Sequence, residues 1–350
     1  MKTAFFYGPG DIRIEERPEP DIGDGDILIK VKACAICGTD LRIFKSGHHS
    51  LKPPQIIGHE ISGIIEKKGR DVSDFKLGER VAVDPIVSCG SCYYCKRGMT
   101  NLCSTFKKTT EAFGYYYPGG FAEYMAIPEK AIKRGNLIRI PDSISFEEAA
   151  IAEPMGCALN GELLSQTGAG DTVLIIGAGP IGVMHASLAR VLGATNIVIS
   201  EISDNRLKMA EDIETADYYI NPENEDLNQL LYNVSEGIGP NVIIVAAPSK
   251  KAQEEAVKIA ANRAHICFFG GLPKDNNISS IDSNMVHYKE LFINGSSGAT
   301  TEHIKICIDF MSSGRIDGKK FISKIINIKD IPGVMHEIDE GRYLKVVVRP

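Results

Sequence analysis

Several features that would assign a chain to a membrane or to nucleic acid are missing from these 350 residues. No stretch approaches the roughly 20 uninterrupted apolar residues that a membrane-spanning helix needs. The apolar run after Met1 is too short for a secretory signal. Basic charge is scarce as well, because Lys and Arg total 39 against 45 Asp and Glu, a net charge of -6. Since nucleic-acid binders depend on basic faces, the sequence predicts a cytoplasmic protein that binds neither membranes nor nucleic acid.

Internal repeats and low-complexity linkers are also absent. Hydrophobic residues make up 43% of the chain and charged residues 24%, which excludes a mainly disordered protein. At roughly 150 residues per domain, the length predicts two or three domains.

The pattern of apolar runs changes near residue 150. Before it, short runs bounded by Gly, Pro and Asp predict β-strands at 27–33, 61–66 and 80–83. After it, buried-strand runs at 171–176, 196–200, 241–245 and 265–269 alternate with helical segments such as 253–261. This alternation predicts a parallel sheet with crossover helices. The last 55 or so residues return to a mixed pattern.

A Gly-rich turn follows the first buried strand of the second part. Gly177-Ala178-Gly179-Pro180-Ile181-Gly182 predicts a dinucleotide site, because glycines let the backbone approach the pyrophosphate at a helix N-terminus. Glu201 ends the next strand, 24 positions after Gly177, where a carboxylate can accept both ribose hydroxyls and would repel a 2′-phosphate. NAD is therefore expected in preference to NADP. Two alternatives stay open: Glu201 is only a solvated strand end, or Arg206 faces such a phosphate.

Nine cysteines are present, and four of them lie within fifteen residues. Disulfide frameworks belong to small secreted domains, so clustered cysteines in a long chain indicate metal. Cys89, Cys92, Cys95 and Cys103 are separated by two, two and seven residues, which predicts a closed, structural zinc site. The long last spacing disfavours an iron–sulfur cluster, and four free thiols are the plain alternative. The isolated Cys34, Cys157, Cys267 and Cys307 are interpreted as small core residues.

A more dispersed set lies in the β-rich part. It consists of Cys37-Gly38-Thr39-Asp40, Gly58-His59-Glu60 and, where the pattern changes, Glu153. A thiolate, an imidazole and a carboxylate leave one zinc position open, as catalytic zinc requires. Spacing alone does not separate this hypothesis from purely structural roles for three single residues.

Taken in this order, the motifs resemble those of the zinc-containing medium-chain alcohol and polyol dehydrogenases over nearly the whole chain. The resemblance implies a GroES-like, β-rich catalytic domain at 1–154 with a four-Cys zinc lobe at 89–103. A Rossmann domain with a doubly wound parallel sheet is implied at 155–295, and a return to the catalytic domain at 296–350. The active site is then expected in the cleft between the domains, and a homo-oligomer, dimer or tetramer, is implied because relatives are oligomeric.

The resemblance also implies roles for single residues. Cys37 and His59 match ligands of the catalytic zinc, Glu153 occupies the position of a third ligand, and Glu60 can enter or leave the coordination sphere. Asp40 matches the carboxylate that orients His59, and Thr39 the hydroxyl that takes the substrate's proton. Zinc, as a Lewis acid, lowers the pKa of a secondary alcohol, and hydride passes to the nicotinamide. Cofactor contacts are implied at Gly177, Gly179, Ile181, Gly182, Glu201, Arg206, Gly270, Gly271 and Leu272.

Two positions depart from the common family pattern. Members acting on simple alcohols commonly carry Cys where this chain has Glu153, so a polyol, cyclitol or sugar alcohol is favoured as substrate. Many relatives have a relay His where this chain has Arg42, and Arg cannot accept a proton. Either His48 or His49 replaces that His, or the relay ends in water through Thr39 and the cofactor ribose.

The loop around Arg42 is basic. It holds Arg42, Lys45, His48, His49 and Lys52, which would suit a phosphorylated sugar alcohol or would simply be solvated surface.

The sequence therefore predicts a zinc- and NAD-dependent oxidoreductase acting on a polyol or sugar alcohol. The competing hypotheses are an amino-alcohol dehydrogenase of the threonine type and a non-catalytic dinucleotide-binding protein. A zinc-ribbon nucleic-acid binder is opposed by the charge balance.

Overall fold

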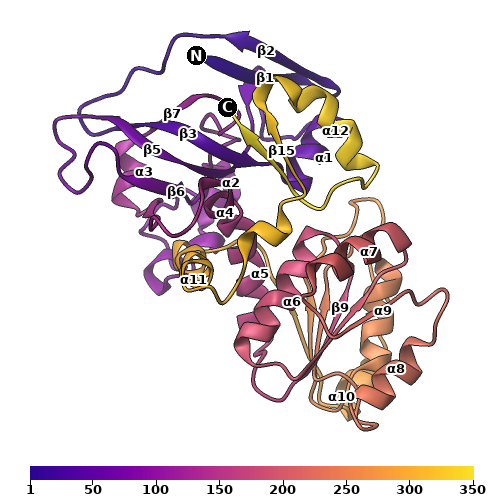
Figure 1. Cartoon of the computed structure of the whole chain (residues 1–350). Helices are drawn as coiled ribbons and strands as arrows, with labels where there is room; N and C mark the ends of the chain where they lie inside the picture. Colours follow the sequence, from indigo (N-terminus) through magenta and orange to yellow (C-terminus); the bar gives the residue numbers. More distant parts are fainter. The chain divides into compact units, whose positions relative to one another are not determined.

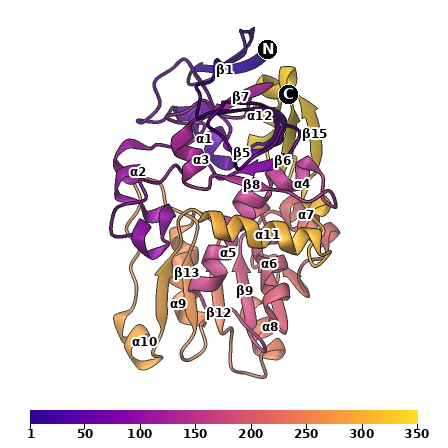
Figure 2. The same ribbon diagram turned by 90° about the vertical axis from the view of Figure 1, so that its left-hand side faces the viewer.

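The computed structural model describes residues 1–350, which form two compact units. The first unit comprises Met1–Gly156 and Ala299–Pro350, and the second comprises Cys157–Gly298. Both chain ends therefore belong to the first unit, and both views show them near one another (Figures 1 and 2). None of the helices combines the length and apolarity needed to cross a bilayer.

The first unit is built on two β-sheets. A three-stranded antiparallel sheet has the order β2-β1-β4. The larger sheet has the order β15-β16-β3-β5-β6-β8, with β7 also paired to β3. The strands are β1 (Lys2–Gly8), β2 (Asp11–Glu16), β3 (Ile27–Ala35), β4 (Gln55–Ile56), β5 (Glu60–Lys68), β6 (Arg80–Val83), β7 (Tyr124–Ile127), β8 (Leu137–Arg139), β15 (Lys324–Asn327) and β16 (Val346–Arg349).

Strand β3 lies at the centre of this sheet, where it pairs with β16, β5 and β7, and all its apolar residues are buried. Lys30 and Lys32 interrupt the run and are only partly buried. Partners from distant parts of the chain meet here: Glu60 on β5 and Val347 on β16 both lie opposite Ala35. The register therefore places the last strand of the chain and the start of β5 on opposite sides of the same β3 residue.

Short helices surround these sheets. The first unit contains α1 (Gly38–Ser46), α2 (Ser104–Thr109), α3 (Glu129–Lys133), α4 (Phe146–Ala150), α11 (Thr301–Ser312) and α12 (Ile331–Asp339), and α5 (Ala152–Leu164) continues into the second unit. Short 3-10 turns are η1 (Cys95–Arg97), η2 (Thr100–Leu102), η3 (Gly318–Phe321) and η4 (Ile328–Asp330). Helix α1 begins directly after Cys37, where the Asp40 side chain accepts a hydrogen bond from the Cys37 N–H at 2.9 Å.

The second unit is a six-stranded, fully parallel sheet with the order β11-β10-β9-β12-β13-β14. Its elements are β9 (Thr172–Ile176), α6 (Pro180–Leu192), β10 (Asn196–Ser200), α7 (Asp204–Ile213), β11 (Tyr218–Ile220), α8 (Leu227–Val234), β12 (Val242–Val245), α9 (Lys250–Ile259), β13 (His265–Phe268), α10 (Ser283–Tyr288) and β14 (Phe292–Gly295). Figure 1 shows α6 and α9 on opposite faces of this sheet. In chain order the strands run 3-2-1-4-5-6, the doubly wound arrangement in which ligands bind where the order reverses, at β9.

The predicted parallel sheet with crossover helices is confirmed. Four of the six strands coincide with the predicted apolar runs, whereas β11 and β14 carry no such run because most of their residues are exposed or half-buried. One core prediction is wrong: Cys157 is only half-buried, while Cys34, Cys267 and Cys307 are buried.

Candidate active site and cofactor-binding site

Three side chains with metal-binding atoms converge in the first unit. The ligand atoms of Cys37, His59 and Glu60 all lie within 4.8 Å of one another. Cys37 ends the segment after β3, and His59 and Glu60 stand where β5 begins. The turn just before His59 requires glycine at position 58. Its φ is +91°, and a Cβ there would lie 2.7 Å from the Phe121 ring. A thiolate, an imidazole and a carboxylate form a donor set that zinc accepts.

Asp40 connects the first helix to this cluster. One of its carboxylate oxygens accepts a hydrogen bond from the backbone N–H of Cys37, and the other lies 3.4 Å from Nδ1 of His59. Burial lowers the pKa of His59, but the negative charges of Asp40 and Cys37 outweigh that effect and hold the pKa well above its usual value. With Nδ1 facing Asp40, Nε2 is the nitrogen left for a metal ion.

A buried lysine that the sequence reasoning missed completes the cluster. The Lys345 ammonium lies 2.6 Å from each carboxylate oxygen of Glu60, and both side chains are almost fully buried. Burial lowers the pKa of Lys345, but the Glu60 carboxylate more than compensates and raises it. The only hint in the sequence is a single lysine that opens the apolar run of the last strand.

Glu153 lies beside this cluster without joining the group of three. It is buried at the start of α5, and burial raises its pKa to about 7; His59 opposes this shift and Glu60 adds to it. Glu153 therefore lies near Cys37 and His59, the residues with which it was predicted to bind zinc. The carboxylate grouped with Cys37 and His59 is that of Glu60, which is paired with Lys345.

Two further residues, Thr39 and Tyr115, lie near the cluster. Thr39 accepts a hydrogen bond at 2.9 Å from Nη2 of Arg42, one helical turn later on α1. Tyr115, which the sequence reasoning also missed, has its ring 6.1 Å from that of His59 and 5.4 Å from that of His48. Burial raises the pKa of Tyr115 to about 12, so its hydroxyl keeps its proton at neutral pH. The run of three tyrosines at 115–117 was the available signal.

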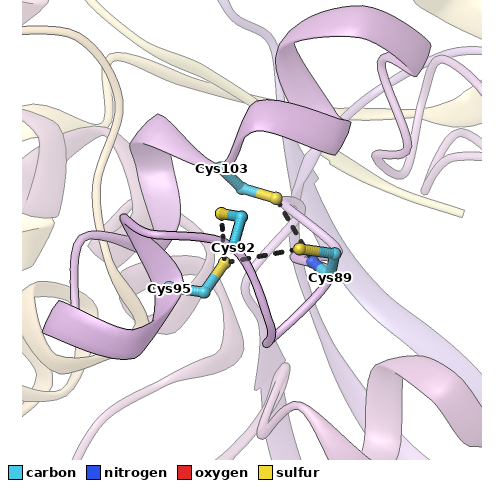
Figure 3. Close-up of side chains that lie close together, drawn as sticks. All are labelled: Cys89, Cys92, Cys95 and Cys103. Carbon is cyan, nitrogen blue, oxygen red and sulfur yellow. Dashed lines mark hydrogen bonds between the residues drawn. The ribbon is translucent and has the colours of Figure 1, made fainter.

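The four-Cys lobe brings its thiols together as predicted. Figure 3 shows Cys89, Cys92, Cys95 and Cys103 pointing toward a common centre. The Sγ of Cys95 lies 3.5 Å from that of Cys92 and 3.9 Å from that of Cys89. Tetrahedral zinc with Zn–S bonds of about 2.3 Å separates its sulfur ligands by about 3.8 Å, so the spacing fits this ion.

The lobe also favours thiolates at two of its cysteines. Hydrogen bonds from the backbone of Ser91 and Cys92 lower the pKa of Cys89 to about 5, and those from Cys95 and Ser104 lower that of Cys92 to about 7. Burial raises the pKa of Cys95 to about 12. A cation bound among the four sulfurs would counter that last effect.

The Gly-rich turn of the second unit has the close approaches that the motif predicts. A Cβ at Gly182 would lie 1.8 Å from the Gly177 carbonyl oxygen, so only glycine lets α6 start this close to β9. Gly179 caps α6, Pro180 is its first residue and Ile181, which is half-buried, follows. The free N–H groups of such a helix start can bind phosphate.

Glu201 lies beside this turn at the end of β10. Its carboxylate accepts hydrogen bonds from the backbone N–H of Ala178 at 2.8 Å and of Ser203 at 3.0 Å. These bonds fix the carboxylate in place and leave lone pairs for ribose hydroxyls. Arg206 is exposed on α7, two residues into the helix.

The third predicted cofactor segment follows β13. Gly270 donates its N–H to the Val245 carbonyl, and a Cβ there would lie 2.5 Å from the Ala247 oxygen. Gly271 is exposed and Leu272 half-buried. The segment therefore lies along the carboxyl end of the sheet, as do Gly177 and Glu201.

Comparison with known proteins decides the family. The alcohol dehydrogenase GroES-like domain matches residues 23–142, and the zinc-binding dehydrogenase domain matches residues 180–313. The starvation-sensing protein RspB of Escherichia coli K12 is 33% identical over 99% of each chain. The chain belongs to the zinc-binding alcohol dehydrogenases. This confirms the predicted GroES-like and Rossmann-type fold and a zinc- and nicotinamide-dependent dehydrogenase.

Other relatives of this dehydrogenase differ in their substrates. Sorbitol dehydrogenase of Bacillus subtilis is 30% identical over 100% of this chain and 97% of its own. L-threonine 3-dehydrogenase of Pyrococcus horikoshii is 35% identical over 85% of this chain and 82% of its own. The family membership therefore leaves the substrate open.

Solved structures of relatives match the whole dehydrogenase. A zinc-binding dehydrogenase of Sinorhizobium meliloti bound to NADP has a TM-score of 0.89 at 31% identity, covering 100% of this chain and 99% of its own. RspB of Escherichia coli CFT073 in complex with NADH has a TM-score of 0.88 at 33% identity, with the same coverage.

Proposed function

We propose that this dehydrogenase oxidises a secondary hydroxyl of a polyol, cyclitol or sugar alcohol and transfers the hydride to NAD. The observation that carries the proposal is the buried carboxylate of Glu153 beside the Cys37, His59 and Glu60 cluster. A carboxylate at this position resembles the sorbitol and threonine dehydrogenases, both of which are among the relatives.

Cys37 and His59, with Glu60 or Glu153, would hold the zinc ion. When bound, zinc supplies a Lewis acid that favours ionisation of the substrate hydroxyl. Asp40 holds the imidazole of His59 in the orientation that leaves Nε2 free. Lys345 balances the charge of Glu60, so that two buried carboxylates can lie close to the thiolate.

Thr39 is the proposed acceptor of the substrate's proton. Its hydroxyl oxygen can accept a hydrogen bond from the substrate while its own O–H donates onward to water or the cofactor ribose. Arg42 already donates to this oxygen and cannot itself take up the proton. The relay through His48 or His49 stays a prediction.

The choice of NAD rests on Glu201. Its fixed carboxylate beside the Gly177 turn suits ribose hydroxyls and repels a 2′-phosphate. The predicted cytoplasmic location and dimeric or tetrameric assembly stay predictions.

An amino alcohol such as threonine is the second candidate, because threonine dehydrogenases are 34% to 36% identical to this chain. The test is NAD-dependent turnover by the zinc-loaded protein across polyols, cyclitols, sugar-alcohol phosphates, threonine and simple alcohols, with Cys37→Ser as the control. NADH production on a polyol that the control lacks supports the proposal. Turnover confined to threonine supports the second candidate, and NAD binding with no turnover of any alcohol contradicts both.

A further inference from the structure

Arg42 is held at the hydroxyl that we propose takes the substrate's proton. Its Nη2 donates to the Thr39 Oγ1 at 2.9 Å, and both residues lie on the same face of α1, three positions apart. The side chain is exposed. A positive charge therefore lies at the Thr39 hydroxyl, on the helix that begins directly after Cys37.

No carboxylate of the chain neutralises this charge within ion-pair distance, whereas the neighbouring lysine is neutralised. Lys45, one turn further along α1, is paired with Asp339 of α12 at 2.9 Å. Helix α12 lies against α1, where the rings of Phe44 and His336 meet at 5.4 Å. Its other nearby carboxylate, Glu337, is bound by Lys324. The acidic groups on the adjacent helix are thus occupied elsewhere.

A guanidinium in this situation has spare binding capacity. Arginine presents five N–H donors in a rigid fork that matches carboxylate and phosphate oxygens, and Thr39 uses only one of them. A bidentate pair with an anionic group would use the rest and supply the missing negative charge.

We propose that Arg42 binds an anionic group of the substrate, so that the substrate is a polyol bearing a carboxylate or a phosphate. This inference rests on the proposed function and narrows its substrate class. Two hydrogen bonds of about 3 Å separate the guanidinium from the reacting oxygen. The anionic group is therefore expected within a few bonds of the carbon that is oxidised.

A purely positioning role for Arg42 predicts something different. If the guanidinium only orients Thr39, its loss would slow neutral and anionic substrates by the same factor. If the guanidinium binds the anionic group, its removal lowers kcat/KM for the anionic substrates more than for the neutral ones. The ratio of the two efficiencies is therefore the informative quantity.

The experiment uses the zinc-loaded protein with matched substrates: polyols of four to six carbons, the corresponding aldonates and the corresponding polyol phosphates. The variants are Arg42→Gln, Arg42→Lys and, as control, Arg315→Gln, an exposed arginine elsewhere in the first unit. Both kcat/KM with NAD and calorimetric binding in the presence of NADH are measured. Aldonates and phosphates form separate arms, which identify the anionic group.

We expect wild type and Arg315→Gln to prefer one anionic series over its neutral polyols. Arg42→Gln should lower that ratio by about 10- to 100-fold, and Arg42→Lys by less, because charge remains without the fork. Equal ratios in wild type and Arg42→Gln would overturn the inference while turnover still upholds the proposed function. Selective binding of anionic polyols through Arg42 without turnover would uphold anion binding by Arg42 but refute the proposed function, and with it the assignment of these polyols as substrates.

Discussion

The two clusters of metal-binding side chains in the first unit are built in opposite ways. The four-Cys lobe comes from residues 89–103, is partly exposed and offers four donors of one kind. The cluster of Cys37, His59 and Glu60 comes from separate elements and mixes donor types, and Lys345 reaches it from the other end of the chain. A closed set of four thiols suits a structural ion, and an incomplete mixed set suits a site that a substrate must enter.

The two sites also differ in their charged groups. Around His59 the structure buries Asp40, Glu60, Glu153 and Lys345 together, so that every charge depends on a neighbour. The lobe contains no carboxylate donor, and backbone hydrogen bonds favour the thiolates of Cys89 and Cys92. Removing a metal-binding side chain should therefore disturb chemistry in the first site and local folding in the second.

The largest effect is expected for Cys37→Ser. Loss of this thiolate should lower kcat/KM on the best substrate by about 10⁴-fold, roughly 5.5 kcal/mol, because the metal that ionises the hydroxyl is lost. The unfolding midpoint should change little. Steady-state kinetics and thermal unfolding check this, with Cys157→Ser as a matched control outside both clusters. Activity within tenfold of wild type would remove Cys37 from the active site.

Lys345→Met should produce the next largest effect, on stability. Glu60 would be left as a buried charge without a partner, which costs about 3–5 kcal/mol. Urea unfolding of the metal-free protein measures this loss. The double variant Glu60→Gln/Lys345→Met should recover most of it, because no charge is then left unpaired. An additive double variant would contradict the pairing.

Cys103→Ser should affect the lobe alone. With one of four sulfurs gone, zinc content should fall from about two ions per chain to about one. The unfolding temperature should fall by about 5–10 °C, the equivalent of 2–3 kcal/mol. At 25 °C, kcat should stay within about threefold. Metal analysis and steady-state kinetics check this prediction. A loss of turnover as large as that of Cys37→Ser would contradict the distinction between a structural and a catalytic site.

Asp84 offers a smaller, pH-dependent test at the segment that joins the two sites. It is buried, and burial raises its pKa to about 6, against hydrogen bonds from Thr301 and the Ile86 backbone. Because the pKa of this carboxyl is higher in the folded than in the unfolded chain, protonation of Asp84 stabilises the folded protein. This contribution to the free energy of unfolding is complete below about pH 4 and is lost as the pH rises through 6. Asp84→Asn cannot ionise, so we expect its free energy of unfolding to rise relative to that of wild type by about 2 kcal/mol between pH 4 and pH 8. Denaturant titrations at these pH values check it, and parallel pH profiles would contradict it.

The fold was largely predictable because its signals are local. The strand β9, the Gly177 turn and the start of α6 are contiguous, and Glu201 follows one strand later. Edge strands β11 and β14 were missed because solvent exposure removes the apolar run that identifies a strand. The candidate site was predictable only in part: Cys37, Asp40 and His59 stand in recognisable motifs, whereas Tyr115 and Lys345 do not.

The features that could be predicted from the sequence are therefore those encoded by residues close together along the chain. Four cysteines in one loop and glycines at one helix start carry their chemistry in their spacing, because short segments have few ways to fold around an ion or a phosphate. The tertiary structure decided which distant charges meet. Lys345 meets Glu60 because β16 and β5 both pair with β3, and Asp339 of α12 forms its ion pair with Lys45 of α1. Coulomb energies depend on separation in space and on burial, and neither can be read from separation along the chain.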